Sequence, residues 1–250
     1  MKLIEKPVDI DFDESPLLRI PPGLPVVGFK KQIVLSIEGN IGAGKSTFLR
    51  TLIKHFGEEN IEFVPEPVHM WTNCNGHNLL EAFYKDPARY AYMFQSFALL
   101  TRLMNQQKPQ KKMIRILERS CLSDFCFAAN CKDTGLMNEL EFAAYQTYYS
   151  YFIKNTPGGP DGIIYLRASP ETCFNRMARR NRHEESSVPL DYLTQIHDRH
   201  ESWLPVGKGV DTVRSVPFVT LEGDLEFESI EDNQVYLIKS VLSLIARIQN

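Results

Sequence analysis

The feature that most restricts the fold of this chain is a glycine-rich octet, Gly39-Asn40-Ile41-Gly42-Ala43-Gly44-Lys45-Ser46, which directly follows the apolar run 33–37. A strand, a glycine-rich turn and a helix start, in this order, are typical of a nucleoside-triphosphate site. The glycines allow the backbone to aim consecutive N–H groups at phosphate oxygens, while the helix that begins at Ser46-Thr47 points its positive end at them. Lys45 can then reach the terminal phosphates, and the Ser46 hydroxyl can bind Mg²⁺. The octet therefore predicts a phosphate-binding loop.

Composition places this loop in an ordinary globular protein. The 250 residues, 43% of them hydrophobic, are enough for one large α/β domain. A net charge of −3 gives no general attraction to nucleic acid or to an anionic membrane. The 5 cysteines form no C-x-x-C pair, which favours reduced thiols over disulfides or zinc. Neither a membrane span nor a signal-peptide core is visible, and early acidic residues argue against a transit peptide. We expect a cytoplasmic or nuclear protein without nucleic-acid or membrane partners.

Prolines and short apolar runs divide the chain. Residues 1–29 contain five of the 15 prolines and are expected to form an extended or mobile leader, followed by a single domain over 30–250. Five strand-like runs at 33–37, 61–64, 113–117, 162–166 and 217–221 alternate with helix-length segments. This alternation predicts a three-layer α/β/α fold of the P-loop NTPase type, with a five-stranded parallel sheet.

Two long helices are predicted from their end signals. Asp86-Pro87 supplies an N-cap and a first-turn proline for a helix over 87–108, while Asn138 and Glu141 form a capping box before a helix over 138–155. Both are rich in aromatic residues, namely Tyr90, Tyr92, Phe94, Phe97, Phe142, Tyr145, Tyr148, Tyr149 and Phe152. These side chains fit either core packing or a helix-bundle interface between subunits, and we expect a homodimer.

Charged residues follow the other predicted strands, at the edge where open α/β sheets bind ligands. The second strand ends in Val64-Pro65-Glu66-Pro67 and the third in Glu118-Arg119-Ser120. The fourth leads to a helix whose far end carries Arg176, Arg179, Arg180 and Arg182. The fifth leads to Glu222-Gly223-Asp224-Leu225-Glu226-Phe227, a turn that could close over a nucleotide base.

These residues match what phosphoryl transfer to a hydroxyl requires. Such a reaction needs a triphosphate cradle, a metal, positive charge near the transferred group, and a carboxylate that takes the hydroxyl proton. Glu66 is the candidate base, and Glu118 the candidate ligand of Mg²⁺ or its water. Arg119 and the arginines of 176–182 can neutralise charge on the phosphate oxygens.

The motifs resemble those of the deoxynucleoside kinases, the family that includes deoxycytidine and deoxyguanosine kinase. The resemblance runs from about Lys31 to Trp203, with a weaker continuation to Phe227. It is carried by Glu38-Gly39-Asn40-Ile41-Gly42, Val64-Pro65-Glu66-Pro67-Val68, Phe94-Gln95, Glu118-Arg119-Ser120 and His200-Glu201-Ser202-Trp203-Leu204. It implies an enzyme that uses ATP or another nucleoside triphosphate, with Mg²⁺, to phosphorylate the 5′-hydroxyl of a deoxynucleoside.

The resemblance also implies residue roles. Glu66 looks like the general base, with Arg119 beside it, Lys45 on the phosphates and Glu118 on the magnesium side. Gln95 is similar to the glutamine that reads the base, with Phe94 and Trp71 lining the base pocket. Tyr84 and Glu185 look like the pair that binds the sugar 3′-hydroxyl. Arg176, Arg180 and Arg182 match the arginines of a mobile lid, here at about 176–187, that closes on the phosphates.

Substrate choice depends on Arg102 and Asp124, which match the charged pair of members that accept cytosine and purines. A thymine methyl group would meet that pair, so deoxycytidine and purine deoxynucleosides are expected ahead of thymidine, in an order that the sequence leaves open. The stretch before Asn130 is one residue shorter than the family pattern near Phe125. One residue turns a helix by about 100°, so the directions of Phe127 and Ala128 stay open.

Two other functions fit parts of this pattern. A nucleoside-monophosphate kinase shares the phosphate loop and the arginines, but its acceptor site needs basic residues where Glu66 stands. A nucleotide-dependent switch ATPase would carry a water-positioning residue and mobile switch loops in place of a sugar-reading pocket. Stimulation of ADP release by deoxynucleosides would mark the kinase, whereas unchanged basal hydrolysis would mark the switch.

Overall fold

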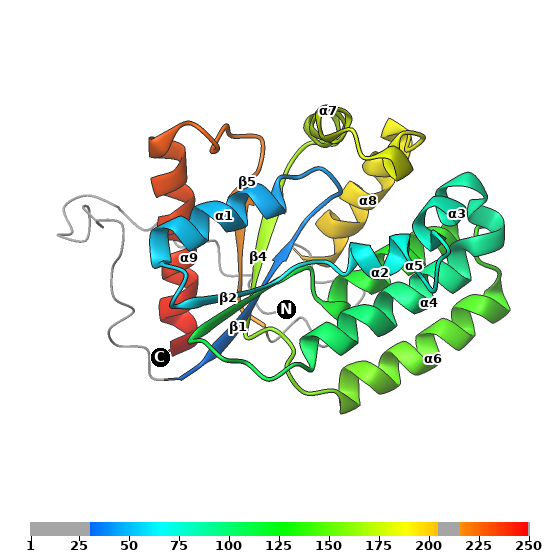
Figure 1. The fold of residues 1–250 in the computed structure, drawn as a ribbon, viewed down its shortest axis with the longest axis horizontal. Coiled ribbons are helices and arrows are strands. Elements are labelled where there is room, and N and C mark those ends of the chain that lie inside the picture. The colour runs from blue at the N-terminus through cyan, green and yellow to red at the C-terminus, as the bar shows by residue number, and fades with distance from the viewer. Residues whose placement is uncertain (1–30, 205–215, 250) are drawn as a thin grey trace, which may run out of the picture.

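A five-stranded parallel sheet forms the centre of the computed structural model, which describes residues 31–204 and 216–249 (Figure 1). The strands are β1 Ile33–Glu38, β2 Ile61–Val64, β3 Ile114–Glu118, β4 Gly162–Arg167 and β5 Phe218–Glu222. They lie side by side in the order β2-β3-β1-β4-β5, with all neighbours parallel. The predicted strands and the fold class are thus confirmed, with strand ends displaced by one residue at most. The predicted leader 1–29 lies outside the described residues.

Helices connect the strands and surround the sheet. They are α1 Lys45–Phe56, α2 Val68–Thr72, α3 Leu79–Lys85, α4 Pro87–Gln106, α5 Cys121–Asp133, α6 Glu139–Asn155, α7 Pro170–Arg180, the short 3₁₀ helix η2 His183–Glu185, α8 Leu190–Trp203 and α9 Glu231–Gln249. The predicted caps are confirmed. The Asp86 side chain accepts a hydrogen bond from the backbone N–H of Arg89, and Asn138 forms a reciprocal capping box with Glu141. In the part of the chain that the structure describes, no helix is both long and apolar enough to span a bilayer.

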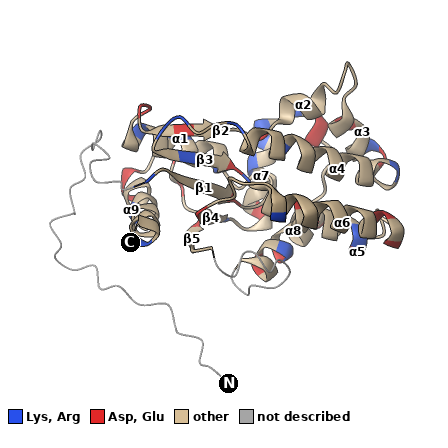
Figure 2. Ribbon diagram, turned by 90° about the horizontal axis from the view of Figure 1, so that it is seen from below, with Lys and Arg blue, Asp and Glu red and all other residues tan. Residues whose placement is uncertain are grey.

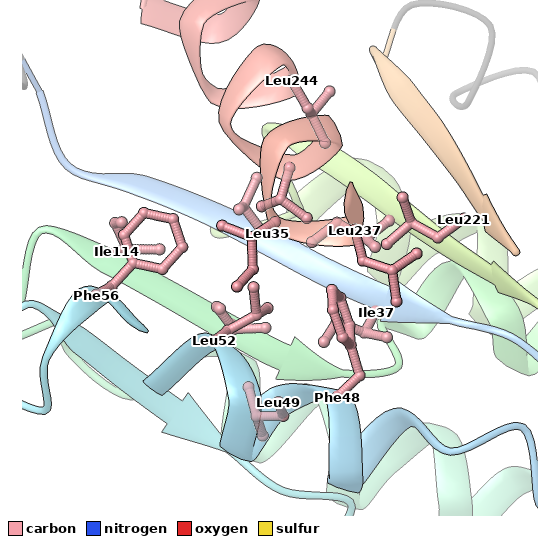
Figure 3. Packing of buried hydrophobic residues seen from close by; sticks show 14 of the residues in the cluster. Leu35, Ile37, Phe48, Leu49, Leu52, Phe56, Ile114, Leu221, Leu237 and Leu244 are labelled. Carbon is pink, nitrogen blue, oxygen red and sulfur yellow. The ribbon is translucent and has the colours of Figure 1, made fainter. Parts of the chain in front are cut away.

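Both faces of the sheet are covered by helices. On one face, Leu35 and Ile37 of β1 pack against Phe48 of α1 and Leu237 of α9 (Figure 3). On the other face, a second cluster joins Ile163 and Tyr165 of β4 to Leu122 of α5 and Trp203 of α8. Alternate residues of a strand point to opposite faces, so β4 can serve both layers. The three-layer prediction is therefore confirmed.

The helices α4, α5 and α6 pack on one another beside the sheet (Figure 1). Tyr145 and Tyr149 of α6 are buried there, so some of the aromatic side chains of the two long helices belong to the hydrophobic core. Other large apolar side chains of the two long helices face outward, and we call them the α4–α6 surface: Met93 (46% exposed), Leu100 (45%), Met104 (50%) and Tyr151 (63%). The charged residues of α6 lie near its two ends and leave its middle uncharged (Figure 2).

His200 of α8 is a fully buried, titratable residue between the sheet and α5. Its Nδ1 lies 2.8 Å from the carbonyl oxygen of Ile196, which can only accept, so this nitrogen carries a proton. The ring stacks on Tyr165, and Phe127 meets it edge-on. Burial lowers the pKa of His200 from 6.5 to about 3. The histidine is therefore neutral in the folded protein at physiological pH.

We predict that His200 makes the fold sensitive to acid. Between pH 6.5 and about 3 the unfolded chain binds a proton that the folded chain does not, so this part of the stability is complete above pH 6.5 and falls as the pH is lowered. His200→Phe keeps a ring for stacking but cannot titrate. Urea unfolding between pH 5.5 and 4.5 should show a pH slope shallower than wild type by about 1.4 kcal/mol per pH unit. Parallel slopes in the two proteins would contradict this assignment.

Candidate active site

The phosphate-binding loop between β1 and α1 takes a backbone form that requires glycine. Gly39 and Gly42 have φ angles of +142° and +78°, and a Cβ on Gly42 would lie 2.3 Å from the Cys173 carbonyl oxygen. Lys45 Nζ donates to the Asn40 carbonyl oxygen at 2.7 Å, and burial, with the charge of Arg119, lowers the pKa of Lys45 to about 7. The first turn of α1 contains no acidic residue, so its positive end is free to attract an anion.

A cavity of about 850 Å³ opens over the carboxyl ends of the strands, next to this loop. It is lined by most of the predicted site residues, namely Ile41, Gly42, Gly44, Lys45, Ser46, Thr47, Glu66, Trp71, Tyr84, Phe94, Gln95, Arg102, Glu118, Arg119, Asp124, Arg176, Arg180, Arg182, Glu185, Glu226 and Phe227. The predicted residues Gly39, Asn40 and Ala43 form the loop behind this lining. Residues spread from 41 to 227 thus share one site of a size suited to a small-molecule ligand.

Glu66 lies at the middle of the cavity between two arginines. Its Oε1 accepts hydrogen bonds from Arg102 Nη1 at 3.1 Å and from Arg119 Nη1, while the side chain is 14% exposed. Burial raises the pKa of Glu66, but the charges of Arg119, Arg102 and Lys45 outweigh it and hold this pKa well below its usual range. Glu66 is therefore a carboxylate that is ionised at neutral pH and partly open to a ligand.

Arg119 has a strained backbone, with a φ of +58° that non-glycine residues rarely adopt. Several contacts hold it there: its N–H donates to the Ile37 carbonyl at 3.0 Å, and its Nη2 donates to the Gly39 carbonyl at 3.1 Å. The guanidinium also lies over the Phe127 ring, 5.1 Å from its centroid. Strain of this kind persists where surrounding structure fixes it, which happens often at functional sites. The contacts aim Arg119 at Glu66.

Ser46 and Glu118 form a pair of oxygen ligands beside the loop. The Ser46 hydroxyl donates to Glu118 Oε1 at 2.5 Å. A hydroxyl and a carboxylate are suitable for Mg²⁺, which usually takes its remaining ligands from water and phosphate oxygens. Residues 31–204 and 216–249 hold no group of three or more His, Cys, Asp or Glu side chains that could bind a metal. These two residues therefore fit a magnesium ion that arrives with a nucleotide.

The far end of the cavity contains a buried ion pair. Arg102 Nε donates to both carboxylate oxygens of Asp124, at 3.1 and 2.9 Å. Burial raises the pKa of Asp124 to about 6, against the attraction of Arg102. Trp71 packs under the Arg102 guanidinium, and the nearby Gln95 amide is buried with its Nε2 3.8 Å from the sulfur of Cys131. This end combines fixed polar groups with aromatic walls.

The stretch near Phe125, expected to be one residue shorter than the family pattern, lies within one continuous helix, α5, over Cys121–Asp133. Within it, Asp124 and Phe127 both line the cavity, whereas Ala128 is buried in the aromatic cluster behind it. Asp124 thus lies beside Arg102, and the ring of Phe127 lies under Arg119.

The three predicted lid arginines have two different environments. Arg180 and Arg182 both bind the carboxylate of Glu185, at 2.5 and 2.8 Å. Arg176 instead donates to the backbone carbonyls of Ala43 (3.0 Å) and Gly223 (2.6 Å) and lies over the ring of Phe227. Arg176 thus ties the phosphate-binding loop to the turn after β5, while the other two arginines sit at the mouth of the cavity.

Some residues of the site had no assigned role in the sequence analysis. Glu38 Oε1 accepts both the N–H (2.9 Å) and the hydroxyl (2.7 Å) of Ser120, which fixes the segment that carries Arg119. Tyr192 of α8 and Phe127 of α5 line the cavity. The position of Glu38, directly before the glycine-rich octet, already indicated in the sequence that this residue lies close to the site. Tyr192 lies on a helix whose apolar spacing is typical of an ordinary core, so its sequence carries no comparable signal, and the direction of Phe127 was left open.

This geometry suits the transfer of a phosphoryl group. The loop and Lys45 can bind phosphates, and Ser46 with Glu118 can hold the accompanying metal. Glu66 and Arg119 stand between this anion site and the pocket walled by aromatic residues. A hydroxyl compound bound in that pocket would have a carboxylate within reach to accept its proton.

Comparison with known proteins agrees with this reading. The sequence model described as "Deoxynucleoside kinase" matches residues 35–246. The chain is 38% identical to deoxycytidine kinase of Mus musculus over 239 residues, which covers 84% of this chain and 90% of the relative. It is 35% identical to deoxycytidine kinase 2 of Gallus gallus over 246 residues (87% and 92%). It is 37% identical to mitochondrial deoxyguanosine kinase of Xenopus laevis over 221 residues (78% and 83%).

Proposed function

The chain belongs to the deoxynucleoside kinase family, and we propose that it transfers the γ-phosphate of ATP to the 5′-hydroxyl of deoxycytidine and purine deoxynucleosides in preference to thymidine. One observation carries this proposal. The Glu66 carboxylate is held by Arg119 and Arg102, between Lys45 of the phosphate-binding loop and the end of the cavity that contains Gln95 and Asp124. A phosphate donor and a hydroxyl acceptor bound on its two sides would meet at Glu66.

In this mechanism the residues around the loop bind and orient the triphosphate. Backbone N–H groups and Lys45 hold the terminal phosphates. Ser46 and Glu118 would hold Mg²⁺, whose charge when bound offsets that of the phosphate oxygens. Arg180 and Arg182 would exchange Glu185 for the phosphates, while Arg176, Glu226 and Phe227 border the place of the donor base.

Glu66 accepts the proton of the acceptor hydroxyl. Its pKa is held low by the two arginines, so the residue is ionised at neutral pH and needs no other group to remove a proton from it. A low pKa also makes it a weak base. In a loose phosphoryl-transfer transition state the bond to the nucleophile forms late, so the position of the base matters more than its strength. Arg119 fixes Glu66 and adds positive charge beside the transferred group.

The inner pocket selects the nucleoside. Gln95, buried with its Nε2 near the sulfur of Cys131, would read the base with its amide, and Tyr84 with Glu185 would bind the sugar hydroxyl. The Arg102–Asp124 pair closes the far end of the pocket. A thymine methyl group placed against this pair would take water away from two charged side chains and offer them no hydrogen bond in return, which is unfavourable.

A panel of acceptors tests the proposal. ADP release with ATP and Mg²⁺ should rise severalfold on addition of deoxycytidine, deoxyadenosine or deoxyguanosine, and less with thymidine. Stimulation by deoxynucleoside monophosphates alone would indicate a monophosphate kinase. Hydrolysis that no acceptor changes would indicate a switch ATPase, and either result would contradict the proposal.

We predict that Glu66→Gln folds but loses most of its turnover. The amide keeps the shape of the side chain but cannot take the hydroxyl proton, and loss of a general base typically lowers kcat about 10²–10⁴-fold. Steady-state kinetics and thermal unfolding should be measured together. Glu58→Gln, the same charge change on an exposed residue, is the matched control. A Glu66→Gln rate within tenfold of wild type would remove Glu66 from the base role.

We predict that the Arg102–Asp124 pair rejects thymidine. Replacing both partners, Arg102→Met with Asp124→Ala, avoids leaving one buried charge unpaired. The double variant should raise kcat/KM for thymidine at least about tenfold and lower it for deoxyadenosine. The reason is that the charged side chains that reject the methyl group are replaced by apolar ones that leave room for it. Acceptor kinetics on both proteins measure this. Wild-type protein that uses thymidine as well as deoxycytidine would already refute the idea.

We predict a homodimer that buries the α4–α6 surface. Met93, Leu100 and Met104 are large, exposed apolar side chains that form one stripe along α4. A monomeric protein rarely leaves such a stripe exposed to water. Light scattering at micromolar concentration should give twice the chain mass of 28.7 kDa. Met93→Glu with Leu100→Glu should give monomers, whereas Tyr236→Glu, at a residue 52% exposed on the distant α9, should not. A monomeric wild type would contradict the prediction.

A further inference from the structure

Asn78, the residue before α3, uses both ends of its side-chain amide. Its Oδ1 accepts the backbone N–H of Glu81 at 3.0 Å and so caps the helix. Its Nδ2 donates to Glu184 Oε1, also at 3.0 Å, across 106 residues of sequence. Capping needs only the oxygen, and aspartate or serine would supply it as well. The nitrogen therefore makes a second, separate link, from α3 to the 3₁₀ helix η2.

This link lies beside the residues that we assign to the sugar. Tyr84 stands on α3, and Glu185 directly follows Glu184 in η2. Tyr84 and Glu185 line the same cavity, and burial, together with the charge of Glu185, raises the pKa of Tyr84. Asn78 is thus the side chain that ties the helix of one sugar ligand to the turn of the other.

The lid arginines alone cannot keep Glu185 in place during the reaction. The carboxylate of Glu185 is 5% exposed and is bound by Arg180 and Arg182. Both arginines leave it if they turn to the phosphates of ATP. The contact from Asn78 to Glu184 does not involve them, and a hydrogen bond to an ionised carboxylate is stronger than one between neutral groups.

We propose that Asn78 is a positioning residue that holds Glu185 at the sugar of the deoxynucleoside by binding Glu184, independently of the lid arginines. The inference rests on the proposed function, since it takes Glu185 as a sugar ligand. It explains why an asparagine caps α3. Aspartate would cap equally well, but would place a second carboxylate about 3 Å from Glu184.

Asn78→Asp tests this inference directly. The cap is retained, so the unfolding temperature should stay within about 3 °C of wild type. Repulsion between the introduced carboxylate and Glu184 should displace η2 and raise KM for the deoxynucleoside about tenfold, while KM for ATP and kcat change less than about threefold. Calorimetric binding of the deoxynucleoside without ATP should weaken to the same extent.

A reversed pair provides the rescue. In Asn78→Asp with Glu184→Gln, the new glutamine amide can donate to the new aspartate, and KM should return to within about threefold of wild type. Asn138→Asp is the matched control, because Asn138 caps α6 through its oxygen in the same way, away from the cavity. Asn78→Ser, which keeps a capping oxygen but is too short to reach Glu184, should repeat the loss if Asn78→Asp fails to fold.

The outcomes separate this inference from the proposed function. Wild-type ADP release that no deoxynucleoside stimulates would overturn both. Normal wild-type activity with an unchanged KM in Asn78→Asp and Asn78→Ser would overturn the inference alone. A raised KM that the Glu184→Gln partner does not restore would also overturn it, because the effect would then not pass through Glu184.

Discussion

The ion pairs of Glu66 with Arg119 and Arg102 are the contacts on which the arrangement of this site depends. They join the end of β2, the end of β3 and the C-terminal part of α4 at one carboxylate. Buried ion pairs add little net stability, because the charges lose their water. Removal of one member, however, leaves a buried charge without a partner. The network therefore restricts the geometry of the site more than it stabilises the fold, and Asp124 completes it by neutralising Arg102.

The register of the sheet explains why these charges meet. Val64 of β2 lies opposite Leu117 of β3, and Glu66 and Arg119 each stand two residues beyond that pair. β1 lies next to β3 with Ile37 opposite Glu118, which places Glu118 beside Ser46 at the start of the following helix. Parallel strands in this register bring three separate sequence motifs to one edge. Hydrophobic packing on both faces, shown for one face in Figure 3, holds that register.

The cavity has one fixed wall and one wall that can exchange partners. The phosphate-binding loop is held by close backbone contact with Cys173, and Arg176 ties it to the turn after β5. Arg180 and Arg182 have side-chain partners only at Glu185 among the contacts of the described residues, so a triphosphate can compete for them. This division allows the donor site to be preformed while the mouth of the cavity changes.

Much of the fold was predictable from the sequence because its signals are local. Alternating apolar runs identified the five strands, the side chains of Asp86 and Asn138 cap the helices that follow them, and glycines marked the phosphate-binding loop. Each of these features depends on hydrogen bonds or backbone angles within a few residues. Motif order also identified the family and placed Glu66 and Arg119 in one site.

Only the tertiary structure decided the features that arise where distant segments approach each other. The left-handed backbone of Arg119 is held by contacts with Ile37 of β1 and with Gly39 after it, and Arg176 is directed to carbonyl groups although its sequence position suggests a lid. The second hydrogen bond of Asn78 and the direction of Phe127 likewise depend on elements far away in the chain. A local pattern determines which conformations a segment can adopt. The partner of each polar group is set by packing and by the register of the sheet, because a buried donor or acceptor must find whichever group the fold brings within about 3 Å.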